Sequence, residues 1–449
     1  MSSKLNKITA SALLIAALLM SIALAGCDLD RAYVDGSSGG KDSKVILNVI
    51  NYHVGTDPGA VYYSYLFHGF LQTDEGANVE FRIEEISDAD AFNQRIKLLI
   101  SSGDLPDVVL SGANNIVELA ARSGKVADLT PYFEADPEWR ALFDDLSLAF
   151  NTVDGKIYGV PVTKEISYIY YNRDLFAQAG ITPPASSFAS WDEFFDVCDA
   201  LKAAGITPLG LDTAGAAQLS SLWFGALVAT QSSAGNKWMN TQYPLSFETP
   251  EVLAAASRLQ RMFSEYTTSD AVGGSYDLMT AHFFRGEAAM IPGGPCMIPD
   301  FSSPDNAPTG FSSRVGVMLM PMDGMLTVPL PGNMVGASDP AKIKAAVAFL
   351  KFSTAIENQL IALEMAGLQP ASSKVDVPDP LRKSDPLMAE ALDIGARAKI
   401  TYGHIHVNWH QNVVDAFSAY LPDLASGNMT PAEFCAGLTE AALKNDVGG

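Results

Sequence analysis

The sequence predicts an α/β protein, and three observations support this class. Short β-branched runs such as KVILNVINYHV alternate along the chain with segments of helical periodicity. The chain has 449 residues, more than one hydrophobic core usually supports, so two domains or lobes are expected. No sequence period of about 20 to 50 residues repeats, which argues against a solenoid or a propeller.

The first 26 residues have the pattern of a secretory signal peptide. Lys4 and Lys7 precede an uncharged apolar run over 8–24, and Cys27 follows two small residues. This ending resembles a bacterial lipobox, which implies cleavage before Cys27 and attachment of diacylglycerol to its sulfur. An ordinary signal peptide cut nearby and an uncleaved anchor are the alternatives.

Residues 27–44 are predicted to be a flexible tether, because this Gly, Ser and Asp-rich segment is too poor in apolar residues to form a core. Two or more acyl chains hold a protein stably on a membrane. We therefore expect an extracytoplasmic protein anchored by lipid to the outer face of the cell membrane. Asp28 resembles an inner-membrane retention signal only if the host has two membranes.

Charge excludes one large class of partners. Removal of residues 1–26 leaves 27 basic residues against 51 acidic ones, a formal net charge of −24. A surface this acidic repels nucleic acid phosphates and anionic lipids, so we expect no nucleic acid partner. Besides Cys27, only Cys198, Cys296 and Cys435 are present, which is neither a disulfide framework nor a paired zinc motif.

The first strand is expected in KVILNVINYHV and ends in a polar cluster that includes His53. A helix follows whose apolar positions, Phe92, Ile96, Leu99 and Ile100, share one face. It should stop at Gly103 and lead into a buried strand over 107–110. In open α/β sheets, the loops after such strands form the ligand crevice, and Asn114 and Asn115 lie in this loop.

Two further helices are predicted downstream. Ser190 is an expected N-cap with Glu193 three residues later, and the amphipathic pattern ends at Gly205. The segment SDPAKIKAAVAFLKFSTAIENQLIAL repeats its apolar residues at helical spacing after the strand-like NMVGAS.

Several segments in order resemble the extracellular solute-binding proteins of family 1, the carbohydrate-binding group that serves ABC importers and includes maltose-binding protein. They read SSGDLPDVVLS, VADLTPYFEAD, DGKIYGVPVTKEISYIYYNRDLFAQAGITPP, SWDEFFDVCDALKAAGITPL, FFRGEAAMIPGGP, KAAVAFLKFSTAIENQ and SGNMTPAEF, and span about residues 45 to 445. The resemblance implies a monomeric, two-lobed, periplasmic-binding-protein-like fold with a hinge and a ligand cleft between the lobes. Residues 45–156 plus 335–378 would form one lobe, and 157–333 plus 380–449 the other.

The resemblance also implies cleft residues. Glu165 matches a family carboxylate that accepts hydrogen bonds from sugar hydroxyls; the alternative is a solvated loop glutamate. Asn114 and Asn115 match hydrogen-bonding positions, although Asx-turn chemistry explains them equally well. Ser111, a further candidate ligand contact, replaces an aromatic residue of the family. His53 is a candidate rim contact or a loop histidine without a role.

Sugar recognition also requires a flat apolar surface. Where the family usually has a tryptophan after GP, this chain has Cys296. Trp223 and Trp409 are candidate replacements, although apolar neighbours make a core position at least as reasonable for Trp223. Asn333, in PGNMVGA, is a further hydrogen-bonding candidate.

The stretch ISYIYY, residues 166–171, is apolar on both alternating faces, so two or three of its tyrosines are expected in the core.

Three competing functions are open to test. HIHVNWH concentrates histidines, but no acidic or cysteine partner is fixed by spacing, so no metal site is expected. The sequence contains no HExxH or GxxxxGK[ST] motif, and its GxSxG match, residues 36–40, lies in the predicted flexible tether, so we expect neither catalysis nor a cofactor. Within the binding class, a sugar is favoured over a polyamine or another cation, which an acidic cleft with aromatic walls would suit.

Overall fold

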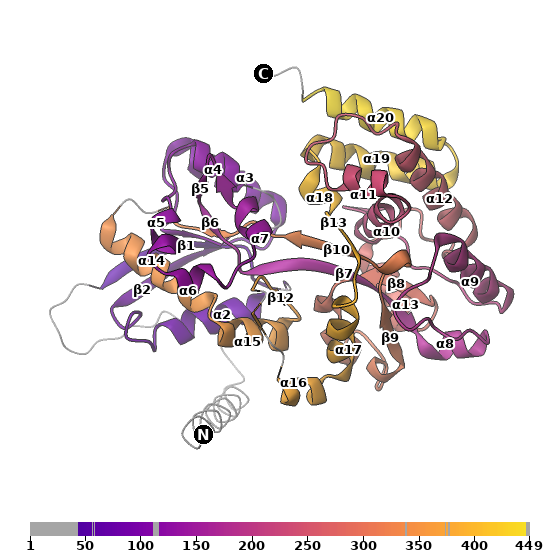
Figure 1. Ribbon diagram of the computed structural model, residues 1–449, viewed down its shortest axis with the longest axis horizontal. Coiled ribbons are helices and arrows are strands. Elements are labelled where there is room, and N and C mark those ends of the chain that lie inside the picture. The colour runs from indigo at the N-terminus through magenta and orange to yellow at the C-terminus, as the bar shows by residue number, and fades with distance from the viewer. Residues whose placement is uncertain are drawn as a thin grey trace. The chain divides into compact units, whose positions relative to one another are not determined.

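The computed structural model describes residues 44–55, 57, 59–110, 116–336, 339–372, 374–375 and 378–445 (Figure 1). The predicted lipidation site Cys27 and the predicted ligand contacts Ser111, Asn114 and Asn115 lie outside these residues. No helix in the described part of the chain is both long and apolar enough to cross a membrane.

The first sheet has five strands in the order β2-β1-β3-β11-β6. Its strands are β1 (Val45–Asn51), β2 (Val79–Glu85), β3 (Val108–Val109), β6 (Gly159–Val160) and β11 (Asn333–Met334). Strand β1 pairs in parallel with β2 and β3, and β11 pairs antiparallel with β3 and β6. The predicted first strand is therefore confirmed.

Helices cover both faces of the first sheet because its strands are apolar on both sides. On one face, Leu47 and Val49 pack with α2 (Ala60–Phe70) and α14 (Pro340–Ser353). On the other face, Ile50 packs with α3 (Ala89–Ser102) and α4 (Val117–Arg122).

Helix α3 shows how local sequence sets the element boundaries. Asp88 caps its start by accepting from the Ala91 N–H, and Gly103 ends it in the left-handed region at φ 78°. Phe92 and Ile96 are buried against the sheet. The helix, its glycine stop and the following strand agree with the sequence prediction.

The second sheet is built around β7 (Thr163–Asn172), which Figure 1 shows as a long arrow. Its first half pairs antiparallel with β12 and β10, its second half antiparallel with β8 and β9, and β10 pairs in parallel with β13. The partners are β8 (Met290–Gly293), β9 (Val315–Met318), β10 (Gly324–Pro329), β12 (Gln369–Pro370) and β13 (Ile400–Tyr402). Tyr168, Tyr170 and Tyr171 are 0 to 4% exposed, so these tyrosines belong to the core as predicted.

Helix α10 (Gln218–Ala229) packs behind the second sheet and is buried from Leu219 to Ala229. Around it lie α9 (Trp191–Ala203), α12 (Pro250–Glu265), α19 (Gln411–Ser426) and α20 (Pro431–Leu443). Ser190 caps α9 as predicted, but the Glu193 carboxylate accepts from the Ala189 N–H rather than from the cap residue itself.

The remaining elements are short. They are β4 (Thr152–Val153), β5 (Lys156–Ile157), α5 (Thr130–Glu134), α6 (Pro137–Arg140), α7 (Asp145–Phe150), α8 (Arg173–Gln178), α11 (Ser233–Met239), α13 (Tyr276–Phe284), α15 (Ile356–Ala366), α16 (Asp379–Ser384), α17 (Pro386–Gly395) and α18 (Ile405–Asn408). Short 3-10 turns cover Pro295–Met297, Pro299–Ser302, Ser312–Arg314 and Pro321–Asp323.

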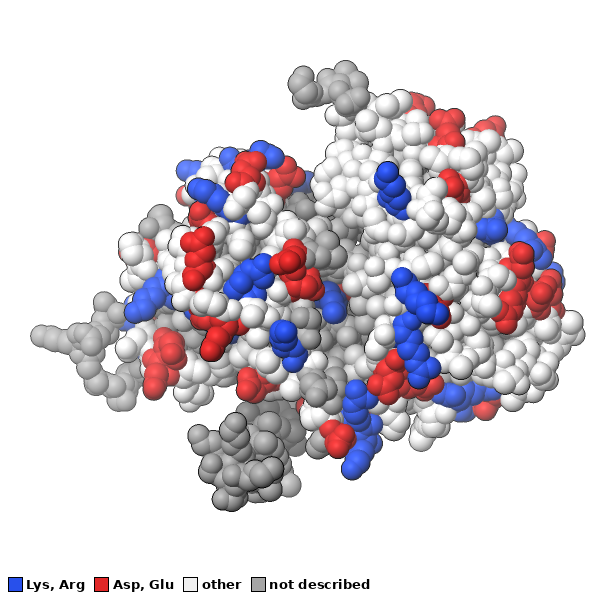
Figure 2. All heavy atoms as spheres, in the orientation of Figure 1, with Lys and Arg blue, Asp and Glu red and all other residues white. Residues whose placement is uncertain are grey.

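The described chain passes between the two sheets where β6 leads into β7, where β10 leads into β11, and around β12. β12 pairs with β7 in the second sheet, although its residues belong to the predicted first lobe. On the face shown in Figure 2, acidic and basic side chains are interspersed.

Candidate ligand-binding site

A cavity of about 320 Å³ lies where segments of both sheets meet, and we call it the Glu165 pocket. Its walls come from the loop after β1, the beginnings of α2, β7 and α10, the turn after β8, and the chain around Asn333 and Gly367. Gly367 has φ 61°, and a Cβ there would lie 2.4 Å from the Pro295 carbonyl oxygen. Only glycine therefore permits this close approach in the wall.

The loop after β1 presents an imidazole as a flat surface. His53 stacks on Tyr63 with ring centroids 4.3 Å apart and planes 7° apart. Its Nδ1 lies 2.9 Å from the Asp57 carboxylate, and Asn51 holds its backbone N–H at 3.0 Å. These contacts fix the ring plane, and the His53 side chain remains 19% exposed.

Asn333 and Tyr63 form a hydrogen-bonded pair beside His53. Asn333 lies on β11 and is 2% exposed, and its amide nitrogen donates to the Tyr63 hydroxyl at 3.4 Å. Burial raises the pKa of Tyr63 to about 12, although the hydrogen bond from Asn333 opposes the shift. The phenol is therefore neutral at pH 7 and offers a proton as well as an acceptor.

Glu165 faces the pocket from β7 and is held by a histidine. Its carboxylate lies 3.3 Å from Nδ1 of His404, and the two side chains are 29% and 7% exposed. The Ser221 hydroxyl donates to the Gln218 carbonyl at 2.7 Å, so toward Nε2 of His404, 3.3 Å away, its oxygen accepts. Both ring nitrogens of His404 thus face oxygen atoms, the Glu165 carboxylate and the Ser221 hydroxyl.

This arrangement keeps Glu165 ionised. Burial opposes the charged form, but the positive charge and hydrogen bond of His404 outweigh it, and the pKa of Glu165 lies below its ordinary value. The neighbouring His406 ring is 4.8 Å from His404. Burial and the charge of His404 lower the pKa of His406 to about 3, so this second ring is neutral.

Cys296 and Tyr276 also line the Glu165 pocket. Cys296 is exposed as a free thiol. Desolvation by the pocket walls and the nearby Glu165 carboxylate raise the pKa of the Cys296 thiol to about 12. The thiol is therefore protonated at neutral pH.

The structure brings three of the predicted contacts together. His53, Glu165 and Asn333 all line the Glu165 pocket. Trp223 and Trp409 do not, and the prediction of a stacking surface at these positions is corrected. Trp223 is 0% exposed because α10 is buried all round, and Trp409 is 3% exposed.

Trp409 packs edge-on against core aromatic rings. Its partners are Phe224, Trp238, Phe247 and Phe417, at centroid distances of 4.8 to 6.1 Å. An indole in this position stabilises the core and offers no face to a ligand.

Sequence reasoning missed Asp57, Tyr63, Tyr276 and His404. The spacing of His53 and Asp57, four residues apart in one loop, was a signal for the pair. Tyr63 and Tyr276 carry no local signal, since each lies near the start of a helix far from β7 in sequence. His404 was noticed only as part of a possible metal motif.

The histidine-rich motif does not form a metal site in this structure. Within the described residues, no group of three or more His, Cys, Asp or Glu side chains is placed to hold a metal ion. His404 serves Glu165 instead, and His410 stacks on Tyr243 at 4.2 Å.

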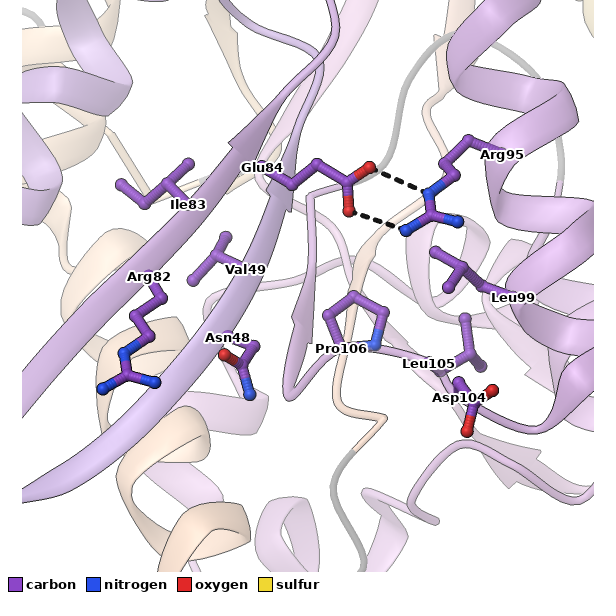
Figure 3. A pocket seen from close by; sticks show the side chains of 10 residues that line it. All are labelled: Asn48, Val49, Arg82, Ile83, Glu84, Arg95, Leu99, Asp104, Leu105 and Pro106. Carbon is purple, nitrogen blue, oxygen red and sulfur yellow. Dashed lines mark hydrogen bonds and ion pairs between the residues drawn. The ribbon is translucent and has the colours of Figure 1, made fainter.

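A second hollow, between β1, β2 and α3, is a weaker candidate (Figure 3). Arg95 donates to both oxygens of Glu84 at 2.8 and 3.2 Å. The dashed lines in Figure 3 mark this pair, and Arg82, which also lines the hollow, pairs with Glu80. These three charges therefore have partners within the protein.

The sequence matches the family model of the bacterial extracellular solute-binding protein over residues 71–390. A putative binding protein of Brucella abortus is 26% identical over 229 residues, which are 51% of this chain and 52% of that protein. The multiple sugar-binding protein of Streptococcus mutans is 25% identical over 296 residues, 64% of each chain. The chain thus spans about half to two thirds of the length of these relatives.

Among solved structures, a chitin oligosaccharide binding protein has the same fold. The TM-score is 0.76 at 23% identity, over 91% of this chain and 100% of that one.

Proposed function

The chain belongs to the bacterial extracellular solute-binding proteins, and on this premise we propose that it captures a sugar or an oligosaccharide and delivers it to the membrane permease of an ABC importer. This is a family of binding proteins, in agreement with the prediction that the chain is not an enzyme. The names of the Streptococcus mutans relative and of the chitin oligosaccharide binding protein support a carbohydrate ligand.

The Glu165 pocket is the observation that carries the proposal. Glu165 supplies a charged acceptor, and Asn333 and Tyr63 supply neutral groups that both donate and accept. Sugar hydroxyls do both as well. The planar rings of His53 and Tyr276 provide surfaces on which the C–H face of a pyranose is removed from water.

Each carboxylate of the pocket is already paired with a histidine, and this favours a neutral polyol ligand over a polyamine. Asp57 and Glu165 both line the pocket, which would suit a cation. Each carboxylate, however, already has an imidazole within 2.9 to 3.3 Å. A cationic ligand would compete with these histidines, whereas a hydroxyl group can donate to the remaining lone pairs.

We assign the closing motion to two lobes, 45–156 with 335–378 and 157–333 with 380–449. The pocket takes walls from both sets of residues, for example His53 from the first and Glu165 from the second. A ligand held from both sides stabilises the closed state over the open one, and the permease then recognises closure. Lipid attachment at Cys27 would keep this monomeric receptor beside the permease on the outer face of the membrane.

The ligand class is tested by thermal shift and calorimetry with monosaccharides, oligosaccharides, spermidine and amino acids. A ligand at about 100 times its Kd stabilises the protein by roughly 2.7 kcal/mol, which is readily measured as a higher melting temperature. Binding of at least one carbohydrate, with no response to spermidine, is expected. A response to spermidine alone would replace the sugar proposal with the cation proposal.

The anchor is tested separately. Cells expressing the full chain or the Cys27→Ser variant are labelled with a palmitate analogue and fractionated. The wild-type protein should carry label and remain with membranes, and the variant should carry none. Equal labelling of both would refute lipidation at Cys27 while leaving the ligand proposal untouched.

A further inference from the structure

Much of the wall of the Glu165 pocket is apolar. Besides its aromatic rings, the pocket is lined by aliphatic side chains and prolines, among them Leu222, Pro292, Pro295, Leu330 and Leu368. An unsubstituted sugar presents hydroxyl groups around most of its ring, and a hydroxyl loses hydrogen bonds to water when it is buried against aliphatic carbon. This part of the wall therefore suits a sugar that also carries an apolar substituent.

One stretch of the apolar wall belongs to the same side of the pocket as Glu165. The turn 292–295 after β8 packs against β7, and a Cβ on Gly294 would lie 3.0 Å from the Ile166 carbonyl oxygen. Both prolines of this turn line the pocket, and so does Ile166, which follows Glu165 directly in the chain. A charged acceptor thus lies next to an apolar surface.

Helix α10 adds a polar amide to this side of the pocket. Gln218 is its first residue and is exposed, and Leu222 follows four residues later, so the two side chains share one helix face. Both residues line the pocket. The Ser221 hydroxyl donates to the Gln218 backbone carbonyl at 2.7 Å and lies 3.3 Å from Nε2 of His404, whose Nδ1 contacts Glu165. These contacts hold the start of α10 beside Glu165.

An acylamino group matches the three features of this wall. Its N–H can donate to the Glu165 carboxylate, its carbonyl oxygen can accept from the Gln218 side-chain amide, and its methyl group can be buried against Leu222. A hydroxyl group offers only the two polar interactions, and the methyl group of a deoxy sugar offers only the apolar one. An ammonium group would compete with His404, which already lies 3.3 Å from the carboxylate.

We propose that the sugar bound in the Glu165 pocket carries an N-acyl group, as an N-acetylhexosamine does, and that this group lies between Glu165, Gln218 and Leu222. The inference rests on the proposed function, because it narrows the ligand of that same pocket to one class of carbohydrate.

The experiment compares sugars that differ in the acyl group. Calorimetry on the full mature chain measures the Kd of N-acetylglucosamine and N-acetylgalactosamine, each beside its parent hexose and the corresponding hexosamine, and the Kd of N,N′-diacetylchitobiose beside that of cellobiose. At least one acetylated sugar should bind at least about tenfold more tightly than its unacetylated counterparts, because it buries an extra methyl group and forms hydrogen bonds through its amide. L-Fucose, a deoxy sugar, tests whether a methyl group alone is sufficient.

The outcomes distinguish this inference from the proposed function. If unsubstituted sugars, hexosamines or fucose bind as tightly as the acetylated sugars, or if only they bind, the inference is overturned and sugar capture stands. If no carbohydrate binds in the thermal-shift and calorimetry screens, both are overturned.

Variants then test the place of the acyl group. Gln218→Ala changes an exposed side chain and should reduce the preference for the acetylated sugar by at least about threefold. Gln94→Ala, which changes an exposed glutamine on α3, should leave the preference unchanged. Leu222→Ala should also reduce the preference, whereas Leu227→Ala, on the same helix but not in the pocket wall, should not.

The readout is the ratio of the Kd values of the acetylated and the parent sugar, which a general loss of stability does not change. Melting curves verify that each variant is folded. An unchanged ratio in both Gln218→Ala and Leu222→Ala would overturn the proposed place of the acyl group, and so would an equal reduction in Gln94→Ala.

Discussion

Replacing Glu165 by glutamine removes one negative charge from the Glu165 pocket while preserving side-chain size and an acceptor oxygen. A hydrogen bond to a charged group contributes about 1.5–3 kcal/mol and a neutral one about 0.5–1.5 kcal/mol. The difference, about 1.4 kcal/mol, corresponds to a tenfold increase in the Kd of the sugar. Calorimetry with the sugar found by screening measures this directly.

The same substitution has a calculable effect on folding. It removes the charge from the contact at 3.3 Å between the 29% exposed Glu165 side chain and a 7% exposed imidazole. This burial lies between an exposed ion pair and a fully buried one, so the free energy of unfolding should fall by about 1–2 kcal/mol. Because the pKa of Glu165 is lowered on folding, this contribution is present above its ordinary value of 4.5 and is lost as the pH falls below it.

Glu84→Gln is the matched control, because Glu84 pairs with Arg95 in the hollow of Figure 3, away from the Glu165 pocket. It should leave the sugar Kd unchanged. If Glu165→Gln binds sugar as tightly as the wild type, Glu165 is not a ligand contact. If both variants weaken binding equally, the effect is not local to the pocket.

Three further results are expected. Trp409→Ala should lower the free energy of unfolding by about 3–5 kcal/mol in urea titrations while leaving the sugar Kd unchanged, and the opposite pattern would make Trp409 a ligand surface. Alkylation of Cys296 by iodoacetamide at about pH 8, followed by mass spectrometry, should be about 100-fold slower than alkylation of glutathione or slower still, because the pKa of the Cys296 thiol is about 12. Partial burial favours the neutral form of His282, but hydrogen bonds to Asp270 and Glu287 outweigh this and raise its pKa. The contribution of protonated His282 to the free energy of unfolding is therefore complete below about pH 6.5 and is lost as the pH rises through the raised pKa. The free energy of unfolding, measured by urea titration, should differ less between about pH 5.5 and 8.5 in His282→Gln than in the wild type. An unchanged difference would assign this pH dependence to other groups.

The fold was accessible from sequence where local chemistry decides the structure. The β-branched run at β1 and the helix ending at Gly103 were predicted with nearly correct bounds, because strand propensity and the left-handed glycine act within a few residues. The predicted helical segment that begins with SDPAKIKAAV and ends with ENQLIAL contributes to two helices, α14 and α15, instead of continuing as one pattern. Ala355 between them has extended backbone angles, which the apolar periodicity did not reveal.

The site was only partly accessible, because it depends on contacts between distant segments. Glu165 could be identified as a polar residue at the start of an apolar strand, but its partner His404 follows more than two hundred residues later. The two tryptophans were misjudged because local sequence does not tell a buried aromatic from a cleft aromatic. Trp223 lies on a helix that is buried on every side. The sequence around Trp223 therefore does not show which face of the helix contacts the core and which could contact a ligand.

The two faces of β7 restrict how this protein can change. Thr163, Glu165 and Ser167 share one face of the strand, and Lys164, Ile166 and Tyr168 share the other, although residues 163–167 all reach the Glu165 pocket. A single-residue insertion or deletion just before β7 would exchange the two sets and would bring lysine where the acid belongs. Divergence in this stretch should therefore proceed by point substitution at constant length.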